Sequence, residues 1–173
     1  MIRLEPLTGH HDRSGFDCGV EALNVWLKQT ALQHQAKGIS RTFVAVANDE
    51  ATAEACMRTG CGDAGRATIL GFYALASAFV LIEDLPPDLA KRYPRQIPVT
   101  RLGRLAIRSA LQGQGLGRLL LADAIVRARH AAQTVGSAGI VVDAKGAAAA
   151  RFYLRYGFIS CRGQPPRLFL ALW

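Results

Sequence analysis

Residues 101–118 read RLGRLAIRSALQGQGLGR. The apolar run Leu102–Ile107 is bounded by Arg and Ser, which is typical of a strand. From Leu116 onward, apolar residues such as Leu120 and Ala124 recur at helical spacing. The glycines in between predict a turn that leads from the strand into the first turn of a helix. Backbone N–H groups there lack intrahelical partners and carry the positive end of the helix dipole, while glycines allow close approach and positive φ. The stretch is therefore suited to holding a pyrophosphate.

Two common phosphate-binding motifs do not match this turn. A Walker A loop would require Gly-Lys-Ser/Thr, which is absent. A dinucleotide fingerprint would require a glycine at the position of Arg118, because the glycines here are Gly113, Gly115 and Gly117. What remains is Gln112-x-x-Gly-x-Gly after a strand. A second segment, residues 140–158, reads IVVDAKGAAAARFYLRYGF, which predicts a buried strand, a short Ala-rich helix and an aromatic–Gly–Phe ending.

Together the two segments resemble the GNAT acetyltransferase superfamily, whose acetyl-CoA signature is Gln-x-x-Gly-x-Gly after a strand. The stretches GFDCGVEALNVWLKQTA (15–31) and PPRLFLAL (165–172), with LGRLAI, resemble the GNAT toxins of bacterial toxin–antitoxin pairs, which acetylate aminoacyl-tRNA. The resemblance covers nearly the whole chain and is weak only around residues 49–66. It implies one GNAT domain over residues 1–173, a homodimer, and neutralisation by a ribbon-helix-helix antitoxin.

The strand and helix patterns also imply an α/β fold around one central sheet. The resemblance adds that this sheet is mixed, has six or seven strands flanked by helices, and splays after the fourth strand to admit acetyl-CoA. Near the N-terminus we expect a helix from Asp17 or Cys18 with a break near Gln29–Thr30. We further expect a loop over residues 48–66 and a strand over residues 68–77.

Acetyl transfer needs a cofactor site, a donor to the carbonyl oxygen and an acid for the departing thiolate. The resemblance assigns the cofactor to ten residues: Leu105, Ala106, Ile107, Gln112, Gly113, Gln114, Gly115, Leu116, Gly117 and Arg118. Backbone N–H groups of 105–107 can act as the oxyanion donor, although plain strand packing would also explain these side chains. The resemblance implies that a tyrosine in the aromatic–Gly–Phe ending protonates the departing thiolate, and Tyr153 is the candidate. A phenol suits this role, since its reference pKa is near 10 and that of a thiol is near 8.5. Phe152 lacks an acidic proton, and Tyr156 is better explained by packing.

A general base is not evident, because residues 91–173 contain no Glu and only two aspartates. Asp123 is expected on a solvated helix face, and Asp143 is expected to fix the turn after a strand. An α-amino group has a pKa of about 7.7–8.0, which esterification of the carboxyl lowers further, whereas a lysine side chain lies near 10.4. The missing base therefore favours an aminoacyl ester as substrate. Many GNAT proteins carry an Asn that contacts CoA at about the position of Gly146. The resemblance therefore does not supply that side-chain contact here, although the glycine backbone can substitute for it.

The net charge of +8 is unevenly distributed along the chain. Residues 1–90 contain 7 Lys/Arg and 11 Asp/Glu, a net charge of −4, while residues 91–173 contain 14 and 2, a net charge of +12. Such a field favours polyanions, although a solvated basic surface in an arginine-rich chain is the alternative. The candidate contacts to tRNA are Lys91, Arg92, Arg95, Arg104, Arg151 and Arg155. Arg151 and Arg155 are four residues apart and share a helix face with each other.

Other patterns in the sequence limit the classes of protein to which this chain can belong. Cys56-x4-Cys61 lacks the second pair expected of a zinc site, so ordinary reduced thiols in a surface loop and no metal are expected. There is no apolar run of about 18 residues and no apolar segment of a signal peptide, so we expect a cytoplasmic protein without a membrane partner. Two alternatives stay open: a small-molecule or peptide amine N-acetyltransferase, and a CoA-sensing or operator-binding module without catalysis.

Overall fold

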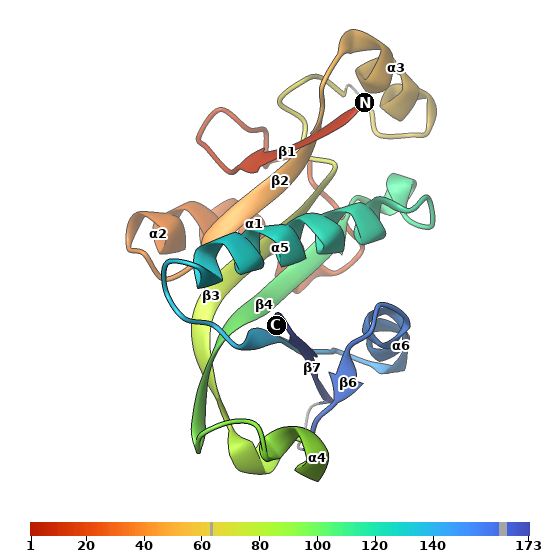
Figure 1. Ribbon diagram of the computed structural model, residues 1–173. Coiled ribbons are helices and arrows are strands. Elements are labelled where there is room, and N and C mark those ends of the chain that lie inside the picture. Colours follow the sequence, from red (N-terminus) through yellow and green to blue (C-terminus); the bar gives the residue numbers. More distant parts are fainter. Residues whose placement is uncertain (63, 163–165) are drawn as a thin grey trace. The chain divides into compact units, whose positions relative to one another are not determined.

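Seven strands, in the order β1-β2-β3-β4-β5-β7-β6, form the mixed sheet of the computed structural model, which describes residues 1–62, 64–162 and 166–173 (Figure 1). The elements are β1 (Ile2–Pro6), α1 (Glu21–Gln29), α2 (Ala31–Ala36), β2 (Arg41–Ala47), α3 (Glu50–Arg58), β3 (Gly71–Leu81), η1 (Ile82–Asp84), α4 (Pro87–Ala90), β4 (Gln96–Ile107), η2 (Ser109–Leu111), α5 (Leu116–Ala132), β5 (Gly139–Asp143), α6 (Ala147–Arg155), β6 (Ile159–Ser160) and β7 (Arg167–Ala171). The expected mixed sheet with flanking helices is confirmed.

The chain divides into two compact units, and each is described by itself. The first unit comprises residues Met1–Leu75 and Arg104–Ala124, and the second comprises Ala76–Gly103 and Ile125–Trp173. Strands β3 and β4 and helix α5 each contribute residues to both units. In the first unit, β1 pairs antiparallel with β2, and β2 pairs antiparallel with β3.

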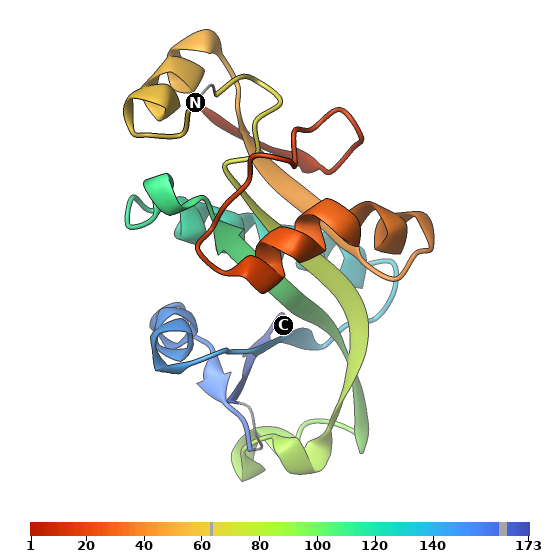
Figure 2. The same ribbon diagram turned by 180° about the vertical axis from the view of Figure 1, so that it is seen from behind.

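Strand β2 of the first unit is buried on both faces, which explains why its sequence TFVAVA is an almost continuous apolar run. Figure 1 shows α5 crossing one face of these strands, and Figure 2 shows α1 and α2 on the other. Between α1 and the sheet, Phe16 and Phe72 meet edge to face at 5.4 Å and Trp26 stacks on Phe72 at 6.0 Å. The core of this unit therefore depends on aromatic contacts that α1 brings to the sheet.

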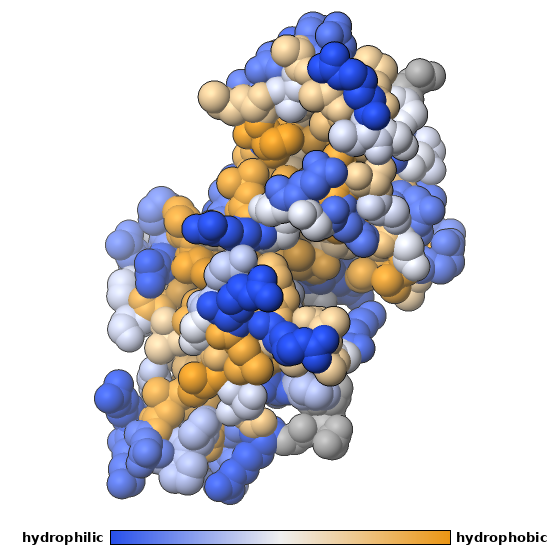
Figure 3. Space-filling view, turned by 90° about the vertical axis from the view of Figure 1, so that its right-hand side faces the viewer, coloured by the Kyte–Doolittle hydropathy of each residue, from blue (hydrophilic) through white to orange (hydrophobic). Residues whose placement is uncertain are grey.

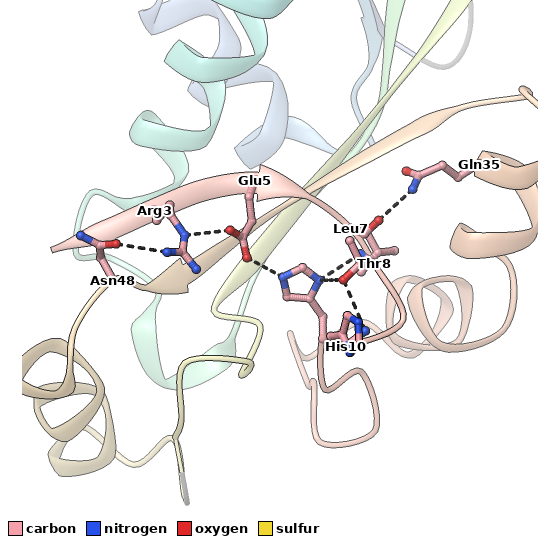
Figure 4. Close-up of polar contacts among 8 residues, drawn as sticks. Arg3, Glu5, Leu7, Thr8, His10, Gln35 and Asn48 are labelled. Atoms are coloured by element: carbon pink, nitrogen blue, oxygen red, sulfur yellow. Dashed lines mark hydrogen bonds and ion pairs between the residues drawn. The ribbon is translucent and has the colours of Figure 1, made fainter.

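A polar cluster fastens the end of β1 (Figure 4). The backbone N–H of Thr8 donates to Nδ1 of the buried His11 at 3.0 Å, so Nε2 carries the proton and donates to Glu5 Oε1 at 2.7 Å. Burial tends to raise the pKa of Glu5, but hydrogen bonds from His11 and Arg3 outweigh it and lower the pKa. Sequence patterns alone do not single out His11, because its partners are supplied by the fold.

A glutamine links helix α2 to the ends of the first two strands. The side-chain amide of Gln35 donates to the carbonyl of Leu7 at 2.8 Å, and its oxygen accepts from the backbone N–H of Thr42 at 3.1 Å. The first of these contacts is drawn in Figure 4. Leu7 N–H in turn donates to Thr42 O at 2.9 Å. The side chain therefore completes backbone hydrogen bonds at the point where β1 ends.

In the second unit, β4 pairs parallel with β5 only at Thr100↔Ile140 and Arg101↔Val141. Strand β7 lies between β5 and β6 and pairs antiparallel with both. The short parallel register agrees with the expected splay after the fourth strand. Buried apolar side chains of this unit form one cluster of Val80, Leu85, Ile97, Val99, Val141 and Phe169.

Three expectations about individual elements were wrong. Part of the expected loop over 48–66 is helix α3, which Asp49 caps by accepting from Thr52 N–H at 2.8 Å. Strand β3 spans Gly71–Leu81 rather than 68–77, and the first helix begins at Glu21 because Gly19 adopts a positive φ of 86°. The break near Gln29–Thr30 is confirmed. Residue 63 of the expected loop and residue 165 of the PPRLFLAL stretch lie outside the described residues.

Candidate functional site

The turn between β4 and α5 exposes its backbone. Gly113 and Gly115 have φ values of 78° and 86°, and a Cβ built on either would meet no atom within 4 Å. Helix α5 has no acidic residue in its first turn, and Arg118 is exposed there. Free N–H groups, the helix dipole and this guanidinium make the turn electropositive. The residues present therefore fit an anionic group such as a diphosphate.

Two side chains, those of Gln112 and Arg108, bond to backbone carbonyl oxygens near this turn and hold it in place. Gln112 Nε2 donates to Ile107 O at 3.0 Å and to Cys18 O at 2.9 Å. Arg108 is 9% exposed, and its guanidinium donates to Ile69 O at 3.1 Å and Gly15 O at 2.8 Å. Sequence reasoning missed Arg108, whose buried position follows only from the fold. The amide nitrogen of Gln112 is used by these two hydrogen bonds, so the Gln112 side chain fixes the end of β4.

The segment predicted to supply the oxyanion donor is packed tightly against β3. Arg108 N–H donates to Leu70 O at 2.9 Å. A Cβ added to Gly71 would lie 3.0 Å from both Ala106 O and Ile107 Cδ1. Ala106 is buried, and Leu105 and Ile107 are half-buried. The side chains of this segment therefore pack in the first unit, and the binding roles of its backbone stay a prediction.

Arg104, also in the first unit, is stacked on an aromatic ring. Its guanidinium carbon lies 4.1 Å from the centroid of the Trp26 ring, and burial lowers its pKa. Trp26 Nε1 is buried and has no hydrogen-bond partner among the described residues. A half-buried cation on an indole differs from the freely solvated arginine that the sequence alone suggests.

Tyr153 lies in the second unit and is 6% exposed. Its ring centroid lies 5.1 Å from that of Phe152 and 5.3 Å from that of Phe158. Burial in this apolar setting raises the pKa of Tyr153 to about 12, so the phenol keeps its proton at neutral pH. Tyr156 packs its ring 5.1 Å from Phe152, as its expected packing role requires. Gly146 precedes α6 as its N-cap, and its carbonyl accepts from Ala150 N–H at 3.0 Å.

Five of the six candidate tRNA contacts lie in the second unit, and all five are exposed: Lys91, Arg92, Arg95, Arg151 and Arg155. Arg95 meets Glu83 at 3.9 Å, with both side chains more than half exposed, a weak pairing. Within residues 1–62, 64–162 and 166–173, no carboxylate lies in ion-pair range of the other four. Figure 3 shows one face on which strongly hydrophilic side chains stand out among apolar ones.

Both aspartates of residues 91–173 have roles other than those expected. Asp123 accepts a hydrogen bond of 2.5 Å from the hydroxyl of the buried Tyr73, so it fixes α5 on β3 rather than standing free in solvent. The carboxylate of Asp143 accepts hydrogen bonds from Nε and Nη2 of Arg167 at 2.7 and 3.2 Å. These bonds link β5 to β7 instead of fixing a turn. Tertiary partners distant in sequence decide both contacts, and no local pattern reveals them.

Neither a metal-binding cluster nor a membrane-spanning helix occurs among the described residues. They contain no group of three or more His, Cys, Asp or Glu side chains that could hold a metal ion. None of the described helices is long and apolar enough to cross a membrane. The expectation that Cys56 and Cys61 lie on the surface was wrong, because they are only 7% and 8% exposed. All four cysteines are free thiols.

Known relatives match nearly the full chain. A tRNA-acetylating toxin of Mycobacterium tuberculosis (strain ATCC 25618 / H37Rv) is 35% identical over 161 residues, which cover 93% of this chain and 86% of the relative. A tyrosine-to-phenylalanine mutant of KacT matches with a TM-score of 0.85 at 31% identity and covers 99% of this chain and 95% of its own. AtaT in complex with acetyl-methionyl-tRNAfMet matches with a TM-score of 0.84 at 31% identity and the same coverage.

Other matched structures of AtaT, at 30% identity with a TM-score of 0.77 and covering 99% of this chain and 93% of their own, contain acetyl-CoA or the C-terminus of the antitoxin AtaR. The family profile described as "Acetyltransferase (GNAT) domain" matches residues 38–160, which include the open glycine turn and Tyr153. With a relative above 30% identity over nearly its whole length, this chain belongs to the GNAT acetyltransferase family.

Proposed function

We propose that this chain is the toxin of a toxin–antitoxin pair and transfers an acetyl group from acetyl-CoA to the α-amino group of aminoacyl-tRNA. The observation that carries the proposal is the match of 93% of the chain to a tRNA-acetylating toxin. An acetylated amino group cannot accept a growing peptide, so the reaction blocks translation. The family match over residues 38–160 runs through residues of both units, which supports one GNAT domain over residues 1–173.

The cofactor residues that we assign are 105–107 and 112–118. Acetyl-CoA, when bound, supplies a thioester whose carbonyl accepts the amine and whose thiolate leaves. The open turn at Gly113 and Gly115 and the first turn of α5 bind the diphosphate through backbone N–H groups and Arg118. The backbone of Leu105–Ile107 donates to the carbonyl oxygen as it gains charge. Gln112 and Arg108 keep this backbone in place through their bonds to carbonyl oxygens.

Tyr153 holds the proton that the departing thiolate needs. Its high pKa keeps the phenol protonated across the physiological range. The same apolar surroundings would raise the pKa of a neighbouring thiol, so the difference in pKa between the two groups stays near its value in water instead of widening. The amine needs no protein base, because an aminoacyl ester is largely neutral at cellular pH. The basic residues Lys91, Arg92, Arg95, Arg104, Arg151 and Arg155 contact the tRNA backbone.

Three finer statements belong to the same proposal. The active protein is a homodimer, its antitoxin is of the ribbon-helix-helix type, and it acts in the cytoplasm, where aminoacyl-tRNA is found. The resemblance to GNAT toxins supports all three. Sedimentation of the purified protein, and co-expression with the product of the neighbouring gene, test the first two directly.

The test of the proposed function uses bulk aminoacyl-tRNA and radiolabelled acetyl-CoA. Wild type transfers label to the tRNA fraction, and Tyr153→Phe loses about 10²-fold or more of the rate, as removal of a general acid does. Tyr156→Phe is the matched control and keeps most activity. Transfer to tRNA falls steeply as salt rises, because phosphate contacts release counterions. Unlabelled tRNA together with efficient, salt-insensitive acetylation of a small amine would contradict the proposal.

A further inference from the structure

Helix α3 ends in a turn that brings two cysteines together. Gly60 has a positive φ of 96°, its N–H donates to Met57 O at 3.1 Å, and Cys61 N–H donates to Cys56 O at 3.3 Å. This is the Schellman pair of bonds, 5→2 and 6→1, with glycine at the left-handed position. In this motif the residues at the two ends of the outer bond contact each other, and here both residues are cysteine.

The backbone geometry suits a disulfide. Standard bond lengths and the 3.3 Å hydrogen bond set an upper limit of about 7.5 Å on the distance between the Cα atoms of Cys56 and Cys61. Any bend along this path brings the two atoms closer, toward the roughly 4.4–6.8 Å that a disulfide spans. The hydroxyl of Thr59 donates to Cys56 O at 2.7 Å and lies 3.9 Å from Cys61 Sγ. Both side chains are buried and both thiols are free.

The turn lies against the segment assigned to acetyl-CoA. A cavity of about 220 Å³ in the first unit is lined by Ile2, Cys56, Leu111, Gln114, Gly115, Leu116 and Leu119. A Cβ on Gly60 would lie 3.8 Å from Ala110 Cβ, in η2. Cys56 therefore shares a cavity wall with Gly115 and with the first residue of α5. A change in the position of its side chain therefore alters the cavity beside the glycine turn.

We propose that Cys56 and Cys61 form an oxidisable pair, which a hydroperoxide converts to an intramolecular disulfide that weakens acetyl-CoA binding at the adjacent turn. The weakening, unlike the disulfide itself, rests on the proposed function. In the first step one thiolate attacks the O–O bond and becomes a sulfenic acid, while the peroxide leaves as water or an alcohol. In the second step the other thiol attacks that sulfur, the S–S bond forms and water leaves. The two thiols lose two electrons and two protons, and the peroxide accepts both.

The direction of the effect follows from the cavity. An S–S bond of about 2.05 Å draws the sulfur of Cys56 toward Cys61 and away from the wall that it shares with Gly115. The cavity that lies beside the glycine turn then changes its shape. Burial also raises the pKa of Cys56 and so lowers its thiolate fraction, which makes its oxidation slow and dependent on a strong oxidant.

The experiment treats the full chain with hydrogen peroxide and digests it with trypsin without reduction. Arg58 lies between the two cysteines, and each of the four cysteines falls on its own tryptic peptide. The expected product is peptide 42–58 joined to peptide 59–66 and two hydrogen atoms lighter than their sum. Acetyl-CoA affinity, measured by calorimetry, falls on the order of three- to tenfold, since small displacements of a positioning loop are costly. Dithiothreitol restores it.

Two variants make the test specific. In the double variant Cys56→Ser/Cys61→Ser, peroxide leaves acetyl-CoA affinity unchanged relative to its own untreated sample. Cys161→Ser keeps the pair and responds as wild type does. Unlinked peptides, or sulfinic acid on either cysteine alone, would overturn the disulfide. A linked pair with unchanged affinity would overturn the coupling. A reduced protein that binds no acetyl-CoA would refute the proposed function and the coupling, while the mapped disulfide is decided by mass alone.

Discussion

Replacement of Arg108 by Met tests how the glycine turn is held. The guanidinium is buried and bonds two carbonyl oxygens, Ile69 O at 3.1 Å and Gly15 O at 2.8 Å. Hydrogen bonds to charged groups contribute about 1.5–3 kcal/mol each, and relief from burying the charge offsets part of their loss. We therefore expect Arg108→Met to lower the free energy of unfolding by about 2–4 kcal/mol. For a chain of this size that lowers Tm by roughly 5–15 °C.

The assay is urea unfolding followed by circular dichroism, with the KM for acetyl-CoA measured on the folded variant. Arg108→Lys keeps the charge and one of the two bonds, so it should recover about half of the lost stability. The matched control is Arg118→Met, because Arg118 is exposed in the first turn of α5. It should raise the KM for acetyl-CoA while changing stability by less than about 0.5 kcal/mol. If Arg108→Met unfolds within about 0.5 kcal/mol of wild type, the inference that Arg108 holds the glycine turn is refuted.

Four further predictions concern other positions. Gly139→Ala should cost about 1–3 kcal/mol or more in urea unfolding, since its Cβ would lie 2.5 Å from a carbonyl of β7, and a wild-type curve would contradict this. Gln112→Leu should raise the KM for acetyl-CoA, because the end of β4 loses the side chain that fixes it; an unchanged KM would count against that role. Tyr73→Phe should cost about 1–2 kcal/mol by losing the bond to Asp123, and equal Tm values would exclude that bond as a stabiliser. Between pH 10 and 12, the free energy of unfolding of wild type should fall relative to that of Tyr153→Phe. The phenol ionises near pH 10 in the unfolded chain and near pH 12 in the folded one, so rising pH favours the unfolded chain in this range. Parallel curves of stability against pH would show that the pKa of Tyr153 is not raised.

Local patterns sufficed for most of the fold. A buried strand is predicted at the start of the segment 140–158, and β5 spans Gly139–Asp143; a helix is predicted from Leu116, where α5 begins. The first is a continuous apolar run, and the second has apolar residues at helical spacing. Helix α3 was missed because only two of its side chains, Ala53 and Cys56, are buried, so it lacks a continuous apolar stripe. The family motifs also sufficed to predict the glycine turn and Tyr153 as candidates. Their catalytic and binding roles stay predictions.

What the sequence could not reveal are contacts between distant residues. Asp123 and Tyr73 are fifty positions apart, and Arg108 and Gly15 are ninety-three apart. Periodicity describes which face of an element is apolar, but it carries no information on which polar group of another element meets it. The side chain of Arg104 shows the same limit, because only the fold places it over Trp26.

The amide bridge made by Gln35 has a consequence for local dynamics. The Thr42 N–H belongs to a buried strand, yet its acceptor is a side chain of α2 rather than the backbone of a neighbouring strand. Its exchange with deuterium should therefore follow the opening of α2, while amides of β2 bonded to β1 or β3 follow the opening of the sheet. A single amide signal thus reports whether this short helix detaches before the strands separate.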